Sequence, residues 1–393
     1  RNICKKCVLH LVVRFHKAKT LRRATFVLIA GLFGVFFHLS GCEQFGALPS
    51  GDSYLKIQKS DNYDVADDKF VNLQQKPILT GPSFWDNPGE NWNNNFFFNS
   101  NQTRPEGLMP ESKIPLPDDF HDSSDTIKFV WLGHSTILVS MGGKVILFDP
   151  IFSNAASPVS LVVKRFQPPV IDLASLPKID IVVVSHDHYD HLDMETIKQL
   201  RDDDISFVVP LGLGAHLEHW GVSAEKITEL DWWEETQIDG LTLICTPSQH
   251  FSGRRGPYRE KRSLWASWLI KSPDQSVYFS GDSGYADHYR QIGERYGSVD
   301  LVFMDSGQYN TRWRYVHNMP EEAVQAVLDI NGQLLVPIHW GMFTLSMHDW
   351  FEPPVRVLAE AARLDVKVLT PLLGQLVDIS EVPEIDRWWE RVN

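Results

Sequence analysis

The stretch Ser185-His186-Asp187-His188-Tyr189-Asp190-His191-Leu192-Asp193 decides which fold to expect for this chain. The apolar, β-branched run 179–184 precedes it and predicts a buried strand. Alternate residues of an extended chain point the same way, so His186 and His188 share one side, and the following turn brings further polar groups round to them. Within six residues, the stretch holds four potential metal ligands: His186, His188, Asp190 and His191.

These ligand types indicate which metals the stretch would bind. Imidazole nitrogen and carboxylate oxygen without thiolate suit zinc, and they also accept manganese or iron. One or two histidines on a polar loop usually have no such role, but four candidate ligands directly after a buried strand favour a metal site. Three more candidates follow apolar runs in the same way, and each alone could be an ordinary hydrogen-bonded polar residue: His250, Asp282 and His339.

The pattern of apolar runs predicts an α/β fold. At 393 residues, with 43% apolar residues, the chain is long enough for one large domain or two. Expected strands cover 128–132, 136–139, 145–148, 179–184, 207–209, 241–246, 265–270, 277–280, 301–304, 334–338, 366–369 and 376–379, with a tight turn at Gly142-Gly143. Expected helices cover 213–220, 285–296, 321–330 and 355–363. This order predicts an αββα sandwich, with two sheets face to face and helices on both outer faces.

The first 41 residues differ from the rest of the chain. They contain eight Lys and Arg residues and no Asp or Glu, and their apolar run 26–39 ends in Leu39-Ser40-Gly41-Cys42. This pattern resembles a bacterial lipoprotein signal in which Cys42 is lipidated, and the alternative is an uncleaved anchor helix. Either way, we expect the body of the protein outside the cytoplasm and held to a membrane. The lipoprotein interpretation places it in the bacterial cell envelope, anchored by lipid and facing the periplasm or the outside.

Composition also predicts the domain boundaries and excludes one class of partner. We expect a signal segment over 1–41, a flexible tether over 42–75, an extension over 76–126 that packs on the core, and the main domain over 127–393. The aromatic stretch 84–98 of the extension either packs on the body or faces a membrane. The net charge is −13 for the whole chain and −21 after residue 41, which offers no basic surface to nucleic acid.

Six separate motifs, added to H-x-H-x-D-H, make the chain similar to a known family. They are WLGHST at 131–136, DPIFS at 149–153, SGDSGY at 280–285, HNMPEEA at 317–323, IHWG at 338–341 and EPPV at 352–355. The set resembles the metallo-β-lactamase superfamily, and within it the branch that contains N-acylphosphatidylethanolamine-hydrolysing phospholipase D. The similarity runs from about residue 131 to residue 379.

The resemblance implies a metallo-β-lactamase-like two-sheet core that binds two divalent metal ions, most readily Zn²⁺, with Mn²⁺ or iron as alternatives. The first ion would be held by His186, His188 and His250. The second would be held by Asp190, His191 and His339. Asp282 would bridge the two, and the pair would activate water and hold a phosphate oxygen.

Further residues receive roles from the same resemblance. Asp190 and Asp282 would serve catalysis as well as metal binding, and His317 matches a substrate-side histidine, although a plain loop histidine is as plausible. Tyr189 and Arg254 are weaker candidates for substrate contacts, because the first could pack on the sheet edge and the second could belong to a solvated basic loop. His134 is expected to make a structural hydrogen bond rather than to bind metal.

The leading hypothesis is a membrane-tethered, metal-dependent phosphodiester hydrolase of phospholipase D type that acts on N-acylphosphatidylethanolamine or a related lipid. The alternative is hydrolysis of a small phosphorylated sugar, lactone or ester, and an apolar channel beside the metals would favour the lipid. An alternative of another class is a non-catalytic cell-envelope lipoprotein, which the presence of all seven candidate ligands disfavours. The expected partners are the phospholipid and the membrane, and the choice between monomer and homodimer stays open.

Overall fold

The computed structural model describes residues 43–80, 101–112, 116–117, 119–122, 126–254 and 261–392. Those from Gly46 onward belong to one compact unit. The predicted signal segment, the candidate lipidation site Cys42 and the aromatic stretch 84–98 lie outside the described residues. Among the helices that are described, none has the length and apolar character needed to cross a bilayer.

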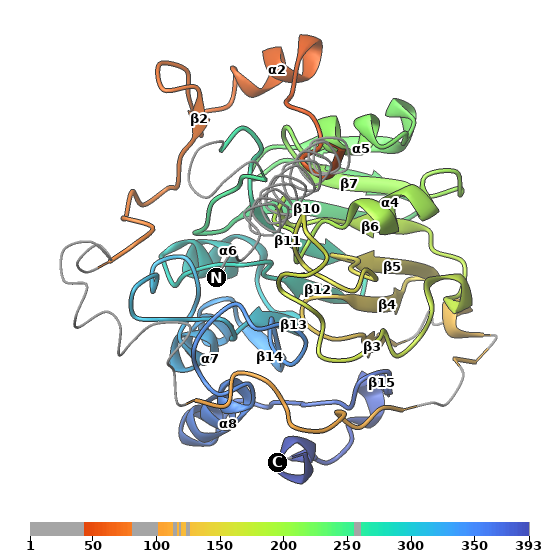
Figure 1. The fold of residues 1–393 in the computed structure, drawn as a ribbon, viewed down its shortest axis with the longest axis vertical. Coiled ribbons are helices and arrows are strands. Elements are labelled where there is room, and N and C mark those ends of the chain that lie inside the picture. Colours follow the sequence, from red (N-terminus) through yellow and green to blue (C-terminus); the bar gives the residue numbers. More distant parts are fainter. Residues whose placement is uncertain are drawn as a thin grey trace, which may run out of the picture. The chain divides into compact units, whose positions relative to one another are not determined.

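Two mixed β-sheets form the centre of the compact unit (Figure 1). The first has the order β15-β3-β4-β5-β6-β7-β8, built from Leu376–Asp378, Lys128–Trp131, Ile137–Met141, Lys144–Phe148, Ile181–Val183, Ser206–Pro210 and Ile227–Leu230. The second has the order β14-β13-β12-β11-β10-β9, built from Gly332–Ile338, Val299–Asp305, Ser276–Phe279, Ala266–Lys271, Leu241–Pro247 and Glu235–Ile238.

Helices cover the outer faces of both sheets (Figure 1). On the second sheet lie α6 (His288–Tyr296), α7 (Pro320–Asp329) and α8 (Glu352–Leu364), and on the first lie α4 (Met194–Leu200) and α5 (Gly214–His219). Short 3₁₀ turns occur at Phe120–Asp122, Leu173–Ser175, Ala224–Lys226, Ile379–Glu381 and Trp388–Arg391. The predicted αββα sandwich is therefore confirmed.

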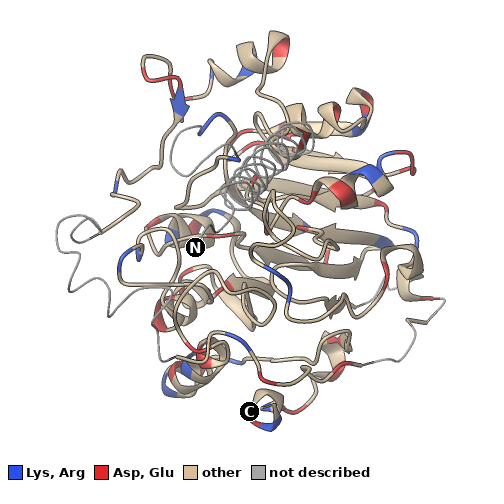
Figure 2. Cartoon of the chain, viewed as in Figure 1, with Lys and Arg blue, Asp and Glu red and all other residues tan. Residues whose placement is uncertain are grey.

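Strand β3 shows how alternation of side chains builds the sandwich. Phe129 and Trp131 belong to the core between the sheets, where the Phe129 ring lies 5.2 Å from that of Phe303 in β13. Val130 lies in the separate core under α4 and α5. Both faces of the strand are thus buried, and each large apolar side chain contributes about 1.5–3 kcal/mol by leaving water. Charged residues gather on helices and loops, while the inner strands are mostly uncharged (Figure 2).

The predicted element boundaries agree with the structure to within a few residues, and the differences have simple causes. Gly142 and Gly143 form the expected turn between β4 and β5 with φ of 56° and 71°, which glycine adopts without steric cost. The expected strand 366–369 makes only an isolated bridge between Leu335 and Val368. Strands β8 and β9 were not predicted, because their edge positions expose polar side chains on a short element.

Residues 46–80, named the N-terminal arm from here on, correct the prediction of a flexible tether. The arm contains α2 (Gly51–Ile57) and the hairpin of β1 (Tyr63–Asp64) and β2 (Lys69–Phe70). It is held to the domain by polar contacts: Asn62 Nδ2 donates to Asp231 Oδ1 at 3.1 Å, and Lys56 Nζ donates to Glu229 O at 2.5 Å. Apolar side chains of the arm also join the core, where Ile57, Tyr63 and Phe70 are buried. The prediction failed because polar contacts and isolated buried residues leave no periodic pattern in a sequence.

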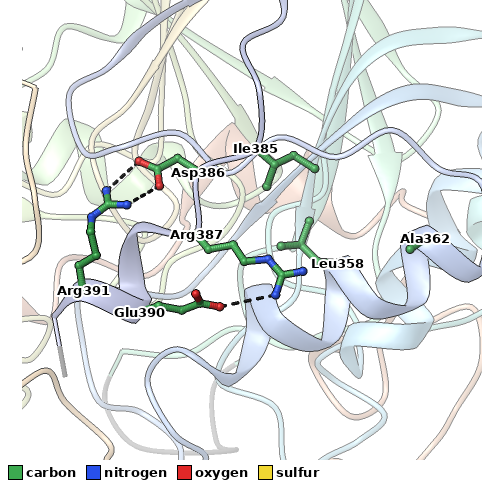
Figure 3. Close-up of a pocket in the computed structure, with 7 residues that line it drawn as sticks. All are labelled: Leu358, Ala362, Ile385, Asp386, Arg387, Glu390 and Arg391. Carbon is green, nitrogen blue, oxygen red and sulfur yellow. Dashed lines mark hydrogen bonds and ion pairs between the residues drawn. The ribbon is translucent and has the colours of Figure 1, made fainter.

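The C-terminal segment packs beside α8 and leaves a cavity of about 490 Å³ (Figure 3). Its charged lining residues are paired with one another: Arg391 with Asp386 at 2.6 Å, and Arg387 with Glu390 at 3.5 Å. Neutralised surface pairs of this kind contribute little stability and offer no unbalanced charge to a ligand.

Candidate metal centre

Loops at the ends of four strands bring the predicted ligands together. The cluster 186–191 follows β6, His250 comes three residues after β10, Asp282 three residues after β12, and His339 directly after β14. With His134 from the turn after β3, these loops form two groups that could hold a metal ion: His186, His188, His250 and Asp282, and His134, Asp190, His191 and His339. A third group combines Asp282 and His339 with Asp305 and His317.

The first group is dominated by imidazoles. His188 Nδ1 lies 2.9 Å from His186 Nε2 and 3.2 Å from His250 Nε2. Burial, with nearby histidines acting in the same direction, holds the pKa values of His186 and His250 well below their usual range. Both rings are therefore neutral, and neutral imidazole is the form that ligates a divalent cation.

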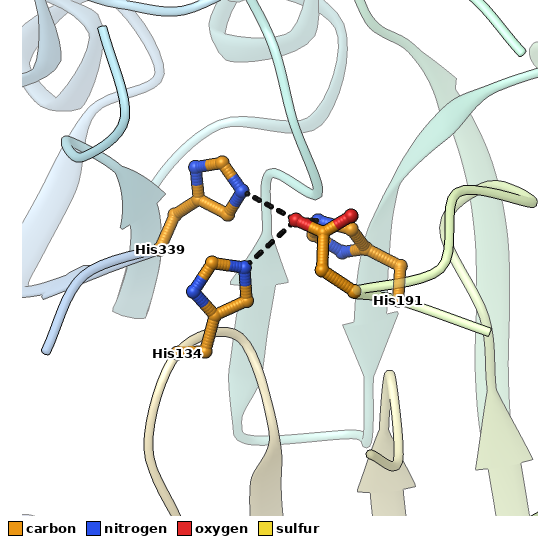
Figure 4. A group of neighbouring side chains, drawn as sticks. His134, His191 and His339 are labelled. Atoms are coloured by element: carbon orange, nitrogen blue, oxygen red, sulfur yellow. Dashed lines mark hydrogen bonds and ion pairs between the residues drawn. The ribbon is translucent and has the colours of Figure 1, made fainter. Parts of the chain in front are cut away.

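The second group is built around Asp190. Its Oδ2 lies 2.9 Å from His134 Nε2 and 3.2 Å from His339 Nε2 (Figure 4). His191 Nε2 lies 3.4 Å from the same oxygen. Burial would raise the pKa of Asp190, but these three imidazoles lower it well below its usual range, so the carboxylate stays charged. His134 contacts this ligand candidate, in line with the hydrogen-bonding role expected for it.

Asp282 stands between the two groups and faces both. Its Oδ1 lies 3.1 Å from His191 Nε2 and 3.2 Å from His339 Nε2, while its Oδ2 lies 3.7 Å from both His186 Nε2 and His250 Nε2. The preceding Gly281 makes this approach possible. It has φ of 54°, and a Cβ there would lie only 2.6 Å from the Cβ of Ser185.

A second layer of contacts fixes the ring orientation of the histidines. Asp149 Oδ2 lies 2.6 Å from His191 Nδ1, and the carbonyl of Val316 lies 2.8 Å from His250 Nδ1. Asp305 serves two rings, with Oδ1 3.2 Å from His339 Nδ1 and Oδ2 3.0 Å from His317 Nδ1. Such partners set which ring nitrogen faces the centre and raise the basicity of the ring.

The backbone at the centre is held in an uncommon conformation. His134, Asp149 and His339 have φ of 53°, 38° and 67°, in the left-handed region that few non-glycine residues adopt. His339 N donates to His134 O at 3.0 Å, so two of these residues brace each other. Strain of this kind persists where surrounding contacts enforce it, most often at functional sites.

The donor set fits divalent cations. The buried atoms His191 Nε2 and Asp282 Oδ1 make no hydrogen bond within the described part of the chain. Burial opposes a charge on His191, yet Asp282, Asp190 and Asp149 raise its pKa well above the usual range. The buried carboxylates therefore make the centre electrostatically negative. A bound divalent cation would offset this negative charge better than any side chain present.

A cavity of about 190 Å³ opens onto both groups. Its polar wall consists of His188, Asp190, His250, Asp282, Gln308, His317 and His339. Its apolar wall consists of Ile78, Leu79, Phe251, Trp313, Val316 and Leu345. With cations bound at the candidate ligands, the polar wall would suit an anionic group and the other wall would suit apolar groups.

The structure brings His317 into the cavity but not the two weaker substrate candidates. The Arg254 guanidinium is 2% exposed, lies 4.0 Å from the Tyr189 ring centre, and donates to the carbonyls of Asp187 and Leu192. Tyr189 Oη donates to the carbonyl of Arg254 at 2.9 Å. Both side chains thus support the cluster loop from behind, and their placement gives no support to a substrate contact.

Two residues near the site were missed from the sequence. Asp305 ends the apolar strand β13, so the rule that selected Asp282 could have found it. Asn72 contacts the backbone of His250 from 178 positions away, and no local pattern predicts such a pairing.

Comparisons with known proteins agree with this geometry. Residues 144–340 match the beta-lactamase superfamily domain. An uncharacterized protein of Mycobacterium tuberculosis is 44% identical over 293 residues, covering 73% of this chain and 78% of that protein. The N-acyl-phosphatidylethanolamine-hydrolyzing phospholipase D 1 of Caenorhabditis elegans is 33% identical over 341 residues, covering 78% of this chain and 95% of that enzyme. Among solved structures, a metallo hydrolase of Ignicoccus hospitalis is similar in fold, with a TM-score of 0.50, 21% identity and coverage of 64% and 98%.

Asp149→Asn should weaken metal binding, because it removes the charge that faces His191 Nδ1. Loss of such an outer partner typically costs about 10–100-fold in metal affinity. Competition with a zinc chelator measures this. The matched control is Asp180→Asn at the other end of β6, where the carboxylate accepts from Val145 N at 2.9 Å and lies 3.8 Å from Lys144 Nζ, away from both ligand groups. Equal zinc affinity in the two variants would contradict the role of Asp149.

Proposed function

The chain belongs to the metallo-β-lactamase superfamily, and from this premise we propose that it is a phosphodiester hydrolase of phospholipase D type with two metal ions. Its substrate is N-acylphosphatidylethanolamine or a closely related lipid. The observation that carries the proposal is the cavity, in which candidate metal ligands form one wall and apolar side chains the other. A lipid phosphodiester has the same division, with one anionic group next to hydrocarbon.

The chain offers a complete ligand set for two ions. One would be held by His186, His188 and His250, the other by Asp190, His191 and His339, with Asp282 shared between them. When bound, two divalent cations supply Lewis acidity toward a phosphate and lower the pKa of water.

The remaining side chains orient the reactants and move protons. Hydrolysis forms a bond from the oxygen of water to phosphorus and breaks the bond to the leaving alcohol, which must gain a proton. Asp190, held in place by His134 at 2.9 Å, orients the attacking water. Asp305 accepts from His317 Nδ1 at 3.0 Å, so His317 must carry a second proton on Nε2 to donate one to the leaving oxygen, and the attacking water releases one proton in the same reaction.

The apolar wall favours the lipid over a small phosphorylated sugar. A sugar phosphate needs hydrogen-bonding groups for its hydroxyls, and most of the cavity wall away from the candidate ligands is hydrocarbon or aromatic. The Caenorhabditis relative, which this chain covers over 95% of its length, carries the matching substrate in its name and supports the same choice.

Envelope location and a lipid anchor at Cys42 belong to the same proposal. They are supported by the basic and apolar segment 1–41 and by the four residues that end at Cys42. Tethering would raise the effective concentration of a membrane lipid at the cavity without any new contact. A Cys42→Ser chain should leave the membrane fraction, and its persistence there would count against lipidation.

The direct test is turnover of N-acylphosphatidylethanolamine by the zinc-loaded protein. We expect release of N-acylethanolamine and phosphatidic acid, and a loss of about 10²–10³-fold in rate in Asp282→Asn, the scale seen when a group that stabilises the transition state is removed. Absence of release from protein that demonstrably binds two zinc ions would reject the lipid substrate. Turnover of a sugar phosphate instead would establish the alternative.

Trp313→Ala tests the apolar wall separately from the chemistry. The Trp313 ring lines the cavity and its Nε1 donates to Gln308 O at 2.9 Å. Removing the ring should lower kcat/KM for long-chain substrates by about 10-fold or more, in line with the 1.5–3 kcal/mol of a buried aromatic contact. For a short-chain phosphodiester the rate should change little. An equal loss on both substrates would mean that Trp313 supports the fold rather than the lipid.

A further inference from the structure

The backbone of His250 has no neighbouring strand to pair with. Strand β10 ends at Pro247, so the N–H and C=O of His250 lie beyond the sheet ladder. Such groups cost free energy when they are buried without a partner. Asn72 of the N-terminal arm supplies both partners, since its Nδ2 donates to His250 O at 2.8 Å and its Oδ1 accepts from His250 N at 3.2 Å. One side-chain amide thus takes the place of an adjacent strand.

The orientation of the Asn72 amide is fixed by a third contact. Trp265 Nε1, on a fully buried side chain, donates to Asn72 Oδ1 at 2.8 Å. An indole N–H can only donate, so the amide oxygen must face it and the amide nitrogen must face the carbonyl of His250. The arm is held to the same loop again two residues later, where Gln249 Nε2 donates to Gln74 O at 2.9 Å.

These contacts, together with Val316, leave His250 one orientation. The Val316 carbonyl holds Nδ1 at 2.8 Å, and Asn72 holds the peptide groups on either side of the α-carbon. His250 Nε2 then points at the centre, 3.2 Å from His188 Nδ1. Metal sites tolerate only about 0.5 Å of misplacement in a ligand, and without Asn72 the backbone of His250 would lose the hydrogen bonds at both its N–H and its C=O.

We propose that Asn72 is a positioning residue of the metal centre, acting through the backbone of His250. The N-terminal arm, which precedes the matched superfamily domain at residues 144–340, is then a working part of the centre. The inference rests on the proposed function in one respect only, that His186, His188 and His250 bind an ion. It does not depend on the substrate.

The test measures zinc retention by the full chain. Asn72→Ala removes all three side-chain contacts, and Asn72→Asp keeps the size and the acceptor oxygen but loses the donor to His250 O. The matched control is Asn62→Ala on the same arm, whose amide donates to Asp231 Oδ1 at 3.1 Å, a residue outside both ligand groups. Zinc content is followed during titration with a chelator, and thermal unfolding is followed on the metal-free proteins.

We expect both Asn72 variants to lose one of two zinc ions at about 10–100-fold lower chelator concentration than wild type, while Asn62→Ala keeps both. Selective loss of one ion, with the second ion retained at the wild-type chelator concentration in a chain that still unfolds cooperatively, is a result that general destabilisation would not give. Wild-type zinc retention in the Asn72 variants would overturn the inference, as would an equal loss in Asn62→Ala. If wild type itself held no zinc, the proposed function would fail first. Should Asn72→Ala not fold, the isosteric Asn72→Asp decides the question.

Discussion

Four buried aspartates share one edge of the sandwich, and the rest of the structure depends on how their charge is offset. Asp149, Asp190, Asp282 and Asp305 are each at most 8% exposed. Removing a carboxylate from water is costly unless it is paired and hydrogen-bonded. Imidazoles from five different loops surround these carboxylates, and cations would complete the balance. This concentration of charge explains why the centre needs two layers of contacts and a strained backbone.

The sandwich provides the rigidity that such a concentration requires. Each loop that delivers a ligand starts from a strand buried on both faces, and the ends of β6, β10, β12 and β14 meet at one edge. A close-packed core resists displacement, so the loops start from fixed positions and differ only in their last few residues. Gly281, His134 and His339 have positive φ angles, and these backbone turns set the direction in which the loops leave the strands. The chemistry is thus assembled from short loops on a stiff frame.

The sequence predicted the fold and brought the ligand candidates into view, because both depend on local patterns. A strand followed by a polar residue is visible in a few letters, as at Asp282 and His339. The direction of a side chain is not visible in this way, which is why the sequence left Arg254 open between a substrate contact and a basic loop, whereas its guanidinium donates to the carbonyls of Asp187 and Leu192. The arm was mistaken for a tether because it is held by single polar pairs with partners up to 231 positions away and by three isolated buried residues, Ile57, Tyr63 and Phe70. Only the folded chain reveals which of these pairs meet.

The N-terminal arm contributes to both the metal centre and the apolar wall of the cavity. Asn72 supports a candidate ligand, and Ile78 and Leu79 of the same segment line the apolar wall of the cavity. Thr80 ties the end of the arm to the loop that carries Trp313, through the carbonyls of Thr311 and Arg312. A change in the arm would therefore reach the ligand and the apolar wall together. The seven candidate ligands lie on the main domain, so chains with the same ligands can differ in substrate according to the segment that crosses the cavity.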